Sequence, residues 1–581
     1  MSTDNKMDAV CIVSTILTVV LTILLMNGVT FGAIPVISME TDSGMFTSSD
    51  LNADWNSTSA TEIALSDMGS VISGNGAYVY DGDVYIAYAG HYVLTGELSD
   101  GSVIIDADKS DKIWLLLDGV KIHCDDDAAI RVEQADKVFL TLADDTENTI
   151  SSGAQYEEDT AASGVDGAIY SRDDLTINGT GALAVSTEYC HGIVCNDDLA
   201  VTGGHISISA VQDGIHANDS VRIRESVISI SAGDDGITVS NDDESAFLYV
   251  ESGDITITDC YEGLEAVDIT IAGGTIDITS TDDGINAAGN GGNSVIRITG
   301  GDITIINPSG RDADGLDSNG SIYIEGGRIF ISVSDGGGNC AIDYGSENGG
   351  ECIISGGTVI ACGGSAMAEG FDEESPQGFL MYRSAAESGT TIKLKDSEDR
   401  ELLSEVIPCS FSLAVLSTPD LKVGDVCTIM IDDVQEQITI DNSKGSGLDA
   451  GGRFGGGMRG GGNRGEMPDG QEHRNNQPFE EREGRAGQSQ DTERPERPED
   501  VVPAGRMLEP PDGANMPDGM EPPGGMEFSD DQRMSDTEGM HSGGRQQLQD
   551  KEDRTMIPAL LGISVLVLLA GLLAAWKYAK W

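Results

Sequence analysis

The chain of 581 residues is poor in aromatic and in basic side chains. Phe, Trp and Tyr make up 5% of it, and 33 Lys and Arg stand against 99 Asp and Glu, for a net charge of −66. So few aromatic residues argue against a large core built around them. So strong a negative charge repels nucleic acid and bare acidic lipid, and we expect no nucleic-acid partner. The partners that it favours are cations, or anionic polymers that cations bridge.

Two further absences concern Cys and Lys. None of the ten Cys residues forms a CxxC pair, which argues against a structural zinc site. Cys409 and Cys427 share one short segment, where they either pair or remain thiols, and the other cysteines are interpreted as small apolar fillers. No Lys lies between Lys137 and Lys393.

A short phrase recurs from Ile130 to about Met367. It consists of an acidic or small residue, then Gly or Ala, then a branched aliphatic anchor, as in Gly214-Ile215 and Gly236-Ile237. Most anchors follow one another after 21 to 27 residues. A repeat of this length corresponds to one turn of a β-solenoid.

Three short segments of alternating apolar and polar residues lie between successive anchors. After the anchor Leu264 they are 264–267, 269–272 and 276–278, separated by Gly or Asp corners. Alternation with period two is typical of strands, and Gly at a corner supplies the positive φ of a tight bend. The sequence therefore predicts an all-β fold: a single-stranded right-handed parallel β-helix with three strands per turn, about ten turns and a small C-terminal β module.

Composition divides the chain into several segments. Residues 34–75 are predicted as a flexible spacer, 76–367 as the β-helix with atypical N-terminal capping turns, and 368–442 as a small β-rich cap or module. Residues 443–555 are predicted as a disordered tail rich in Gly, Met, Pro and Glu.

Apolar segments bracket the chain. Residues 1–33 are predicted as a signal peptide or an N-terminal anchor, because 10–26 carry no charge. Residues 556–576 are long enough for a transmembrane helix, and Lys577 and Lys580 place the end at 577–581 in the cytoplasm. We therefore expect localisation at the cell membrane, with the extracellular domain facing the outside.

Acidic residues gather at one corner of the predicted helix, because equivalent positions of successive turns stack into columns. Stacked carboxylates repel one another unless a cation lies between them, and hard oxygen ligands without His or Cys suit Ca²⁺ better than Zn²⁺ or Mg²⁺. The alternative is that Asp and Asn serve as corner residues that bond to backbone. His191 and His216, one turn apart, are interpreted as solvated surface residues. The predicted metal ligands are Glu262, Glu265, Asp282, Asp283, Asn286, Asp312, Asp314 and Asp317.

A second column, on the middle strand of each turn, carries Arg and Tyr. Tyr stacks on a sugar face and Arg pairs with a carboxylate in bidentate fashion, so these residues suit a polysaccharide groove. The alternative is that they are ordinary exposed strand residues. The predicted carbohydrate-binding residues are Arg222, Tyr249, Arg297, Tyr323 and Arg328.

Several phrases in the chain resemble a known family. The sequence reads AGHYVLTG at 89–96, LLDGV at 116–120 and NTI at 148–150, with Asp-Gly-Ile repeated. Together they resemble the carbohydrate-binding domain-containing proteins of bacterial cell surfaces over roughly 76–442. The resemblance implies a calcium-containing parallel β-helix, related in fold to pectate lyases, that binds cellulose-like or polygalacturonate-like glycans.

Similarity to those lyases bears on both calcium and catalysis. Asp314-Gly315-Leu316-Asp317 matches the Asp-Gly-x-Asp calcium element, and 283–286 and 262–265 are variants of it. The lyases also need a Lys or Arg base near the calcium, and the regular solenoid has no Lys. The Arg residues that remain, which are poor bases, are Arg222, Arg224, Arg297, Arg311 and Arg328.

The sequence thus predicts a membrane-anchored, extracellular, Ca²⁺-dependent protein that binds a plant-type or cell-wall polysaccharide, uronate or cellulosic, without cutting it. We assign no catalytic residue and expect a monomer. Two alternatives stay open: a pectate-lyase-like β-elimination enzyme that uses Arg297 or Arg328, and a structural surface stalk or adhesin.

Overall fold

The computed structural model describes residues 44–443, apart from 56–58, 242–244, 290–291, 309–310, 312, 337 and 367. Strands dominate this part, which holds one short α-helix, α2 (Glu158–Ala162), and one 3-10 turn, η3 (Ser346–Asn348). The apolar segments predicted at 1–33 and 556–576 and the tail predicted at 443–555 fall outside it, except for Ser443. Within the described residues no helix combines the length and apolarity that a membrane crossing requires.

One strand of every turn lies in a twelve-stranded sheet, the first ladder. All its pairings are parallel except that of β3 with β4, which is antiparallel. The strands are β3 (Ala77–Tyr80), β4 (Asp83–Ile86), β6 (Val103–Asp106), β8 (Ile130–Gln134), β11 (Gly167–Ser171), β14 (His191–Cys195), β17 (Ile215–Ala217), β20 (Ile237–Val239), β23 (Leu264–Ala266), β26 (Ile285–Ala287), β29 (Asp314–Ser318) and β31 (Cys340–Ile342).

The other two strands of each turn form a second and a third parallel ladder. The second contains β9 (Lys137–Leu142), β12 (Asp174–Gly179), β15 (Asp198–Val201), β18 (Ser220–Ile223), β21 (Phe247–Val250), β24 (Asp268–Ile271) and β27 (Val295–Ile298). The third contains β10 (Glu147–Ser152), β13 (Ala182–Thr187), β16 (His205–Ala210), β19 (Val227–Ala232), β22 (Asp254–Cys260), β25 (Thr275–Ser280) and β28 (Asp302–Asn307). Long strands run through both ladders at the ends: β5 (Gly90–Leu98), β7 (Lys112–Cys124), β30 (Ser321–Val333) and β32 (Cys352–Gly363).

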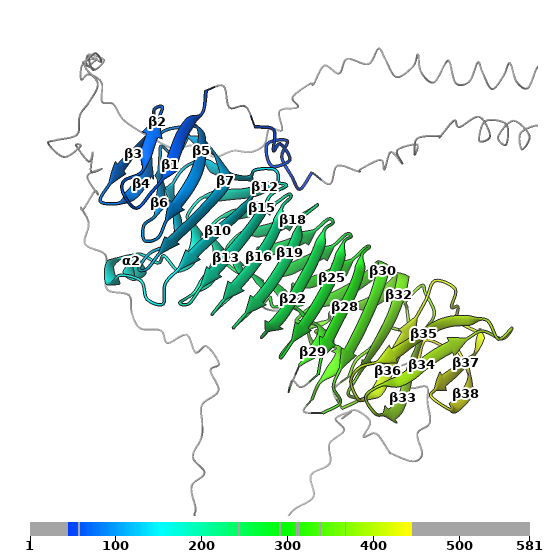
Figure 1. The fold of residues 1–581 in the computed structure, drawn as a ribbon. Helices are drawn as coiled ribbons and strands as arrows, with labels where there is room; N and C mark the ends of the chain where they lie inside the picture. Colours follow the sequence, from blue (N-terminus) through cyan, green and yellow to red (C-terminus); the bar gives the residue numbers. More distant parts are fainter. Residues whose placement is uncertain are drawn as a thin grey trace, which may run out of the picture. The chain divides into compact units, whose positions relative to one another are not determined.

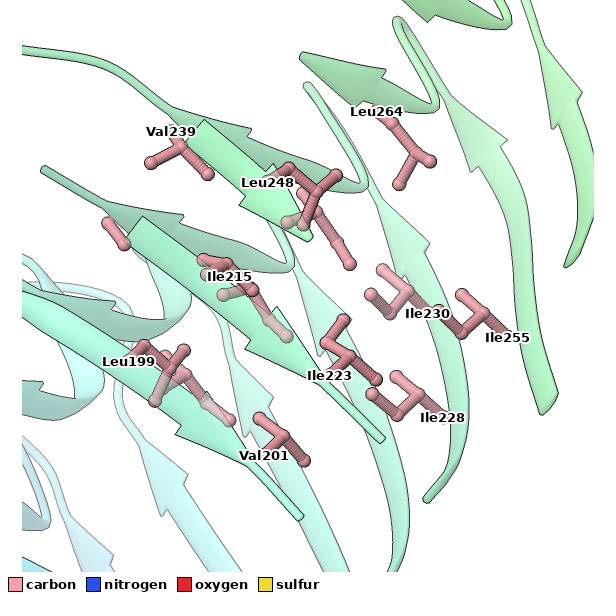
Figure 2. Packing of buried hydrophobic residues seen from close by; sticks show 14 of the residues in the cluster. Leu199, Val201, Ile215, Ile223, Ile228, Ile230, Val239, Leu248, Ile255 and Leu264 are labelled. Atoms are coloured by element: carbon pink, nitrogen blue, oxygen red, sulfur yellow. The ribbon is translucent and has the colours of Figure 1, made fainter. Parts of the chain in front are cut away.

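Each turn therefore contributes one strand to each of three parallel ladders, which confirms the predicted parallel β-helix. In Figure 1 the third-ladder strands from β13 to β28 lie side by side along the domain. The aliphatic residues that alternate along the strands point inward, as Leu199, Ile223 and Ile230 do in Figure 2, and all three are buried. Burial of such side chains from every turn is the main stabilising term of a solenoid.

Glycine serves two purposes in the repeat. Gly274 and Gly301, at corners between the second and third ladders, have φ of 94° and 96°, as the sequence predicts. Where Gly precedes an anchor, the close approach of the next turn requires it, because a Cβ would clash. A Cβ on Gly236 would lie 2.5 Å from the carbonyl oxygen of Gly263 and 2.6 Å from Ile257 Cγ2. The Asp-Gly-Ile phrase thus marks where consecutive turns touch.

The segment 44–52, which we call the strap, lies against the second ladder. The Asp50 side chain is completely buried, and its Oδ1 accepts hydrogen bonds from Lys137 Nζ (2.9 Å) and Thr176 Oγ1 (2.7 Å). The Asp50 carbonyl accepts a hydrogen bond from Thr202 Oγ1 at 2.6 Å. Farther along, β1 (Thr61–Leu65) pairs with β5, and β2 (Val71–Ser73) pairs with β1. The prediction of a flexible spacer over 34–75 is therefore wrong for these parts, because polar groups of the solenoid bind them.

The C-terminal part ends the solenoid. β36 (Phe411–Ser417) pairs antiparallel with β32 and with β33 (Phe379–Ala386). A separate antiparallel sheet contains β34 (Thr390–Lys395), β35 (Glu401–Ile407), β37 (Val426–Ile431) and β38 (Val434–Thr439). Cys409 and Cys427 are buried free thiols here, so they do not form the disulfide that the sequence left open.

Candidate functional site

Acidic side chains stack along one edge of the first ladder, in the register that the sequence predicts. Glu265 pairs with Asn286 of the next turn, and Asn286 pairs with Asp317 of the turn after that. We call the following residues the acidic edge: Asp213, Asp235, Glu262, Glu265, Asp283, Asn286, Asp314 and Asp317. Three of its acids, Asp213, Asp235 and Asp283, have at most 9% of their surface exposed.

Part of this edge has a structural role of the kind that the corner alternative describes. A carboxylate of one turn accepts a hydrogen bond from the backbone N–H of the equivalent residue in the next turn. Asp213 Oδ1 accepts from the N–H of Asp235 (3.1 Å), and Asp235 Oδ1 accepts from that of Glu262 (3.0 Å). Asp283 Oδ1 accepts from the N–H of Asp314 at 2.7 Å. These bonds use one oxygen of each carboxylate and leave the other for a further partner.

The carboxyl groups of the edge also lie close to one another. The charges of Asp317 and Asp314 act on Asp283, and those of Asp213 and Glu265 act on Asp235. Carboxylates this close cannot all remain ionised without a compensating charge. Among the described residues, no Lys or Arg forms an ion pair with the following carboxyls of the edge: Asp235, Glu262, Glu265, Asp283 and Asp317.

The pKa values reflect this lack of compensation. Burial, followed by the charges of Glu265 and Asp235, raises the pKa of Glu262 to about 8. Burial and the neighbouring carboxylates likewise raise the pKa values of Asp235, Asp283 and Asp317. A divalent cation among these oxygens would replace the protons and remove the repulsion.

Asn286 supplies an independent observation. Its Nδ2 donates to Glu262 Oε2 at 3.0 Å, whereas its Oδ1 is buried and has no partner among the described residues. A buried amide oxygen without a partner loses the free energy of a hydrogen bond. Because it lies between carboxylates on both neighbouring turns, Asn286 Oδ1 fits the role of a neutral ligand to a hard cation.

Three predicted ligands remain. Asp282 is hydrogen-bonded by the hydroxyl of Tyr261, and this bond is the main cause of the raised pKa of Tyr261. Asp314 Oδ1 accepts from the backbone N–H of Cys340 at 2.6 Å and therefore extends the backbone pattern by one turn. Asp312 lies outside the described residues.

The edge extends two turns further toward the N-terminus than the predicted ligand set. Asp213 Oδ2 lies 3.1 Å from His191 Nδ1 and 2.8 Å from His216 Nδ1. Burial opposes ionisation of Asp213, but its hydrogen bonds with the two imidazoles hold its pKa well below the usual range. The interpretation of both histidines as solvated surface is wrong, because their side chains are only 15% and 27% exposed. The sequence already indicated this neighbourhood, because His191, Asp213 and Asp235 occupy equivalent positions of successive turns.

Exposed aromatic residues flank the edge and were not singled out from the sequence. Tyr261 directly precedes Glu262 and is 49% exposed, and Tyr189, two residues before His191, is 37% exposed. The backbone N–H of Tyr261 bonds to the carbonyl of Asp234, which fixes the Tyr261 corner against the preceding turn. Such a ring beside a row of carboxylates offers an apolar face that a sugar ring can cover.

The Arg and Tyr residues of the middle strands stack in the predicted register, but the strap covers two of them. Arg222 pairs with Tyr249 across β18 and β21. The strap lies over both: Arg222 Nη1 donates to the carbonyl of Met45 at 3.0 Å, and the Phe46 ring lies 6.3 Å from that of Tyr249. Tyr249 is therefore only 7% exposed, and the prediction that these two residues line an open groove is wrong.

The other three predicted carbohydrate-binding residues are accessible but engaged. The Arg297 guanidinium lies 4.6 Å from the centre of the Tyr323 ring and forms an ion pair with Glu325. Arg328 pairs with Asp302 (3.0 Å) and Glu405 (2.6 Å). Burial would lower the pKa of Arg328, but its bonds to those two acids raise it. Arg328 is therefore held in its charged form, which makes it unsuitable as a base.

Comparisons with known proteins agree with the resemblance found in the sequence. A family model described as carbohydrate-binding domain-containing protein matches residues 80–339. A protein of that description from Acetivibrio thermocellus is 37% identical over 137 residues, which are 23% of this chain and 48% of that protein. The chain thus spans about half the length of this relative. The resemblance is confirmed over residues 80–339.

A solved structure also matches. It is that of the polysaccharide lyase-like protein from C. thermocellum, in a gadolinium derivative. The sequences are 30% identical, and the match covers 46% of this chain and 96% of that one, with a TM-score of 0.37.

Proposed function

We propose, from the similarity of residues 80–339 to carbohydrate-binding domain-containing proteins, that this β-helix binds an acidic polysaccharide through calcium ions on its acidic edge. The observation that carries the proposal is the row of uncompensated carboxyls around the unpartnered Asn286 Oδ1. Glu262, Glu265, Asn286, Asp283 and Asp317 would hold the ions, each bringing an oxygen of the kind that Ca²⁺ prefers.

Calcium bound there would neutralise the edge and leave coordination positions for the carboxylates of a uronate chain. Tyr261 would lie against a sugar ring, because it is exposed and its hydroxyl is already held by Asp282. Without a cation, the edge would repel such a chain. Binding would therefore depend on calcium, with specificity for spaced carboxylates.

The extracellular, membrane-anchored location expected from the two apolar segments forms part of this proposal. So does the absence of catalysis. The candidate bases Arg297 and Arg328 lie on β27 and β30, in the sheet of the second and third ladders, and are paired with acids. The candidate calcium ligands lie on or next to strands of the first ladder.

The test is retention of the full-length chain on immobilised polygalacturonate and on cellulose, with calcium and with a chelator. We expect retention on polygalacturonate in calcium and release by the chelator. Retention on neither support under either condition would favour the stalk, and retention on cellulose that ignores calcium would contradict the acidic edge as the site. Absorbance from an unsaturated product in the same incubation would establish the lyase instead.

A further inference from the structure

The cluster of His191, Asp213 and His216 lies at the N-terminal end of the acidic edge and differs from it chemically. Its ligand atoms are two imidazole nitrogens and one carboxylate oxygen, all within 4.8 Å of one another. The histidines stand on adjacent turns, on β14 and β17, and their ring centres lie 4.9 Å apart. Asp213, in the loop before β17, lies between them.

Both imidazoles direct Nδ1 at the same oxygen. Asp213 Oδ1 is engaged by the backbone N–H of Asp235, so Oδ2 alone faces the two rings, at 3.1 Å and 2.8 Å. In a tetrahedral zinc site with bonds of roughly 2.0–2.1 Å, neighbouring ligand atoms are about 3.3 Å apart. The separations of 3.1 Å and 2.8 Å are shorter than that value, so the side chains would move slightly apart around an ion.

The two contacts of His191 Nδ1 cannot both be favourable. The backbone N–H of Asp213 donates to this nitrogen at 3.1 Å, which requires a lone pair there. The same nitrogen also faces Asp213 Oδ2 at 3.1 Å, where two acceptors repel one another. If Nδ1 carried a proton, that proton would face the donating N–H of Asp213. One of the two contacts is therefore unfavourable whether or not Nδ1 is protonated.

The surroundings are built to hold these groups in place. The Asp213 side chain is only 7% exposed, and Gly192 and Ile193 donate their backbone N–H groups to the carbonyls of Asp213 and Gly214. Asp166 and Glu265, two turns away on either side, add negative charge around His216. His216 remains 27% exposed, so an ion can reach the cluster from solvent.

We infer that His191, Asp213 and His216 bind a transition-metal ion of the Zn²⁺ class, at a site separate from the proposed calcium ligands. Imidazole nitrogen suits Zn²⁺, Cu²⁺ and Ni²⁺, whereas Ca²⁺ takes oxygen ligands. Two protein nitrogens and one oxygen leave a further position for water or an oxygen of a neighbouring molecule. A bound ion would join β14 to β17 and connect two adjacent turns of the solenoid.

The test is a calorimetric titration of the metal-free full-length chain with ZnCl₂ in excess calcium, with Co²⁺ absorption as a second readout. We expect one zinc equivalent that calcium does not displace. His216→Gln and His191→Gln should each weaken zinc binding at least about tenfold, whereas His205→Gln, at an exposed position of β16, should leave it unchanged.

Asp317→Asn separates this inference from the calcium proposal. This variant should lower calcium binding and leave zinc binding as it was. Thermal unfolding of each metal-free variant identifies any that fails to fold, and the Co²⁺ spectrum of the folded variants then decides. Zinc binding that is the same in the His191→Gln/His216→Gln double variant, or that calcium abolishes, would overturn the inference.

Discussion

At the scale of the single residue, the carboxyls of the first ladder serve two roles. One oxygen accepts a backbone N–H from the next turn, as Asp235 and Asp283 show, and this role needs no ion. The carboxyls also lie near one another, and their mutual repulsion calls for a proton or a cation. The corner alternative and the calcium alternative are therefore both compatible with the same side chains.

Protonation of Glu262 makes the stability of the metal-free protein depend on pH. Its pKa is about 8 in the fold, against an ordinary 4.5. Between those values the folded chain holds a proton that the unfolded chain has released, so stability falls as pH rises from about 4.5 to about 8. In chelator, the full-length chain should unfold at a higher temperature at pH 5 than at pH 8.

Glu262→Gln should reduce this difference, because Gln does not titrate. Asp277→Asn, an exposed acid on β25 of the third ladder, serves as the control and should leave it unchanged. A metal-free protein that is more stable at pH 8 than at pH 5 would contradict the assignment.

Tyr261 should be the main aromatic contact of the glycan. Loss of an exposed ring that stacks on a sugar costs about 1 kcal/mol, so Tyr261→Ala should weaken polygalacturonate binding about fivefold in calcium. Tyr323→Ala, on the second ladder, should change it little. Affinity measured by calorimetry checks both, and a loss confined to Tyr323→Ala would move the glycan to the middle-strand column.

At the scale of the element, the strap determines which part of the second ladder is exposed to solvent. It covers the part of the second ladder that holds Arg222 and Tyr249, and its contacts are polar as well as apolar. Sequence reasoning missed this because the Ser-, Thr- and Asp-rich composition of 38–60 is also that of a linker. Lys137 and Thr202, which bind Asp50, lie 87 and 152 residues away from it in the chain. No local sequence pattern therefore predicts these contacts.

Asp50→Ala should release the strap. The substitution leaves Lys137, 7% exposed, without its closest carboxylate, and breaking a buried pair in this way costs about 3–5 kcal/mol. Asp174, 3.5 Å from Lys137, should offset part of this loss. Hydrogen exchange of the amides in 45–50 measures the release, and we expect fast exchange in the variant.

Asp54→Ala, at an exposed strap-side position, is the matched control. Protection in 45–50 that persists in Asp50→Ala would show that apolar contacts of Phe46 hold the strap alone. The Asp50 pKa is lowered to about 2 because its bonds to Lys137, Thr176 and Thr47 outweigh burial, so its contribution should be lost only as pH falls from about 4 through about 2.

At the scale of the whole molecule, the repeat explains why the register could be predicted. Each anchor aliphatic returns to the same place in the core, so Glu265, Asn286 and Asp317 become neighbours although 21 and 31 residues separate them. Counting along the sequence was enough to find that column. It was not enough to find which carboxyls accept a backbone N–H, or that Asp282 turns to Tyr261, because those depend on side-chain packing.

The most direct test of the account is a calorimetric titration of calcium into the metal-free full-length chain, followed by oligogalacturonate. We predict saturable calcium binding that Glu262→Gln and Asp317→Asn each weaken at least about tenfold, with oligogalacturonate binding only after calcium. Calcium binding that both variants leave unchanged, or oligogalacturonate binding of equal strength in chelator, would contradict it.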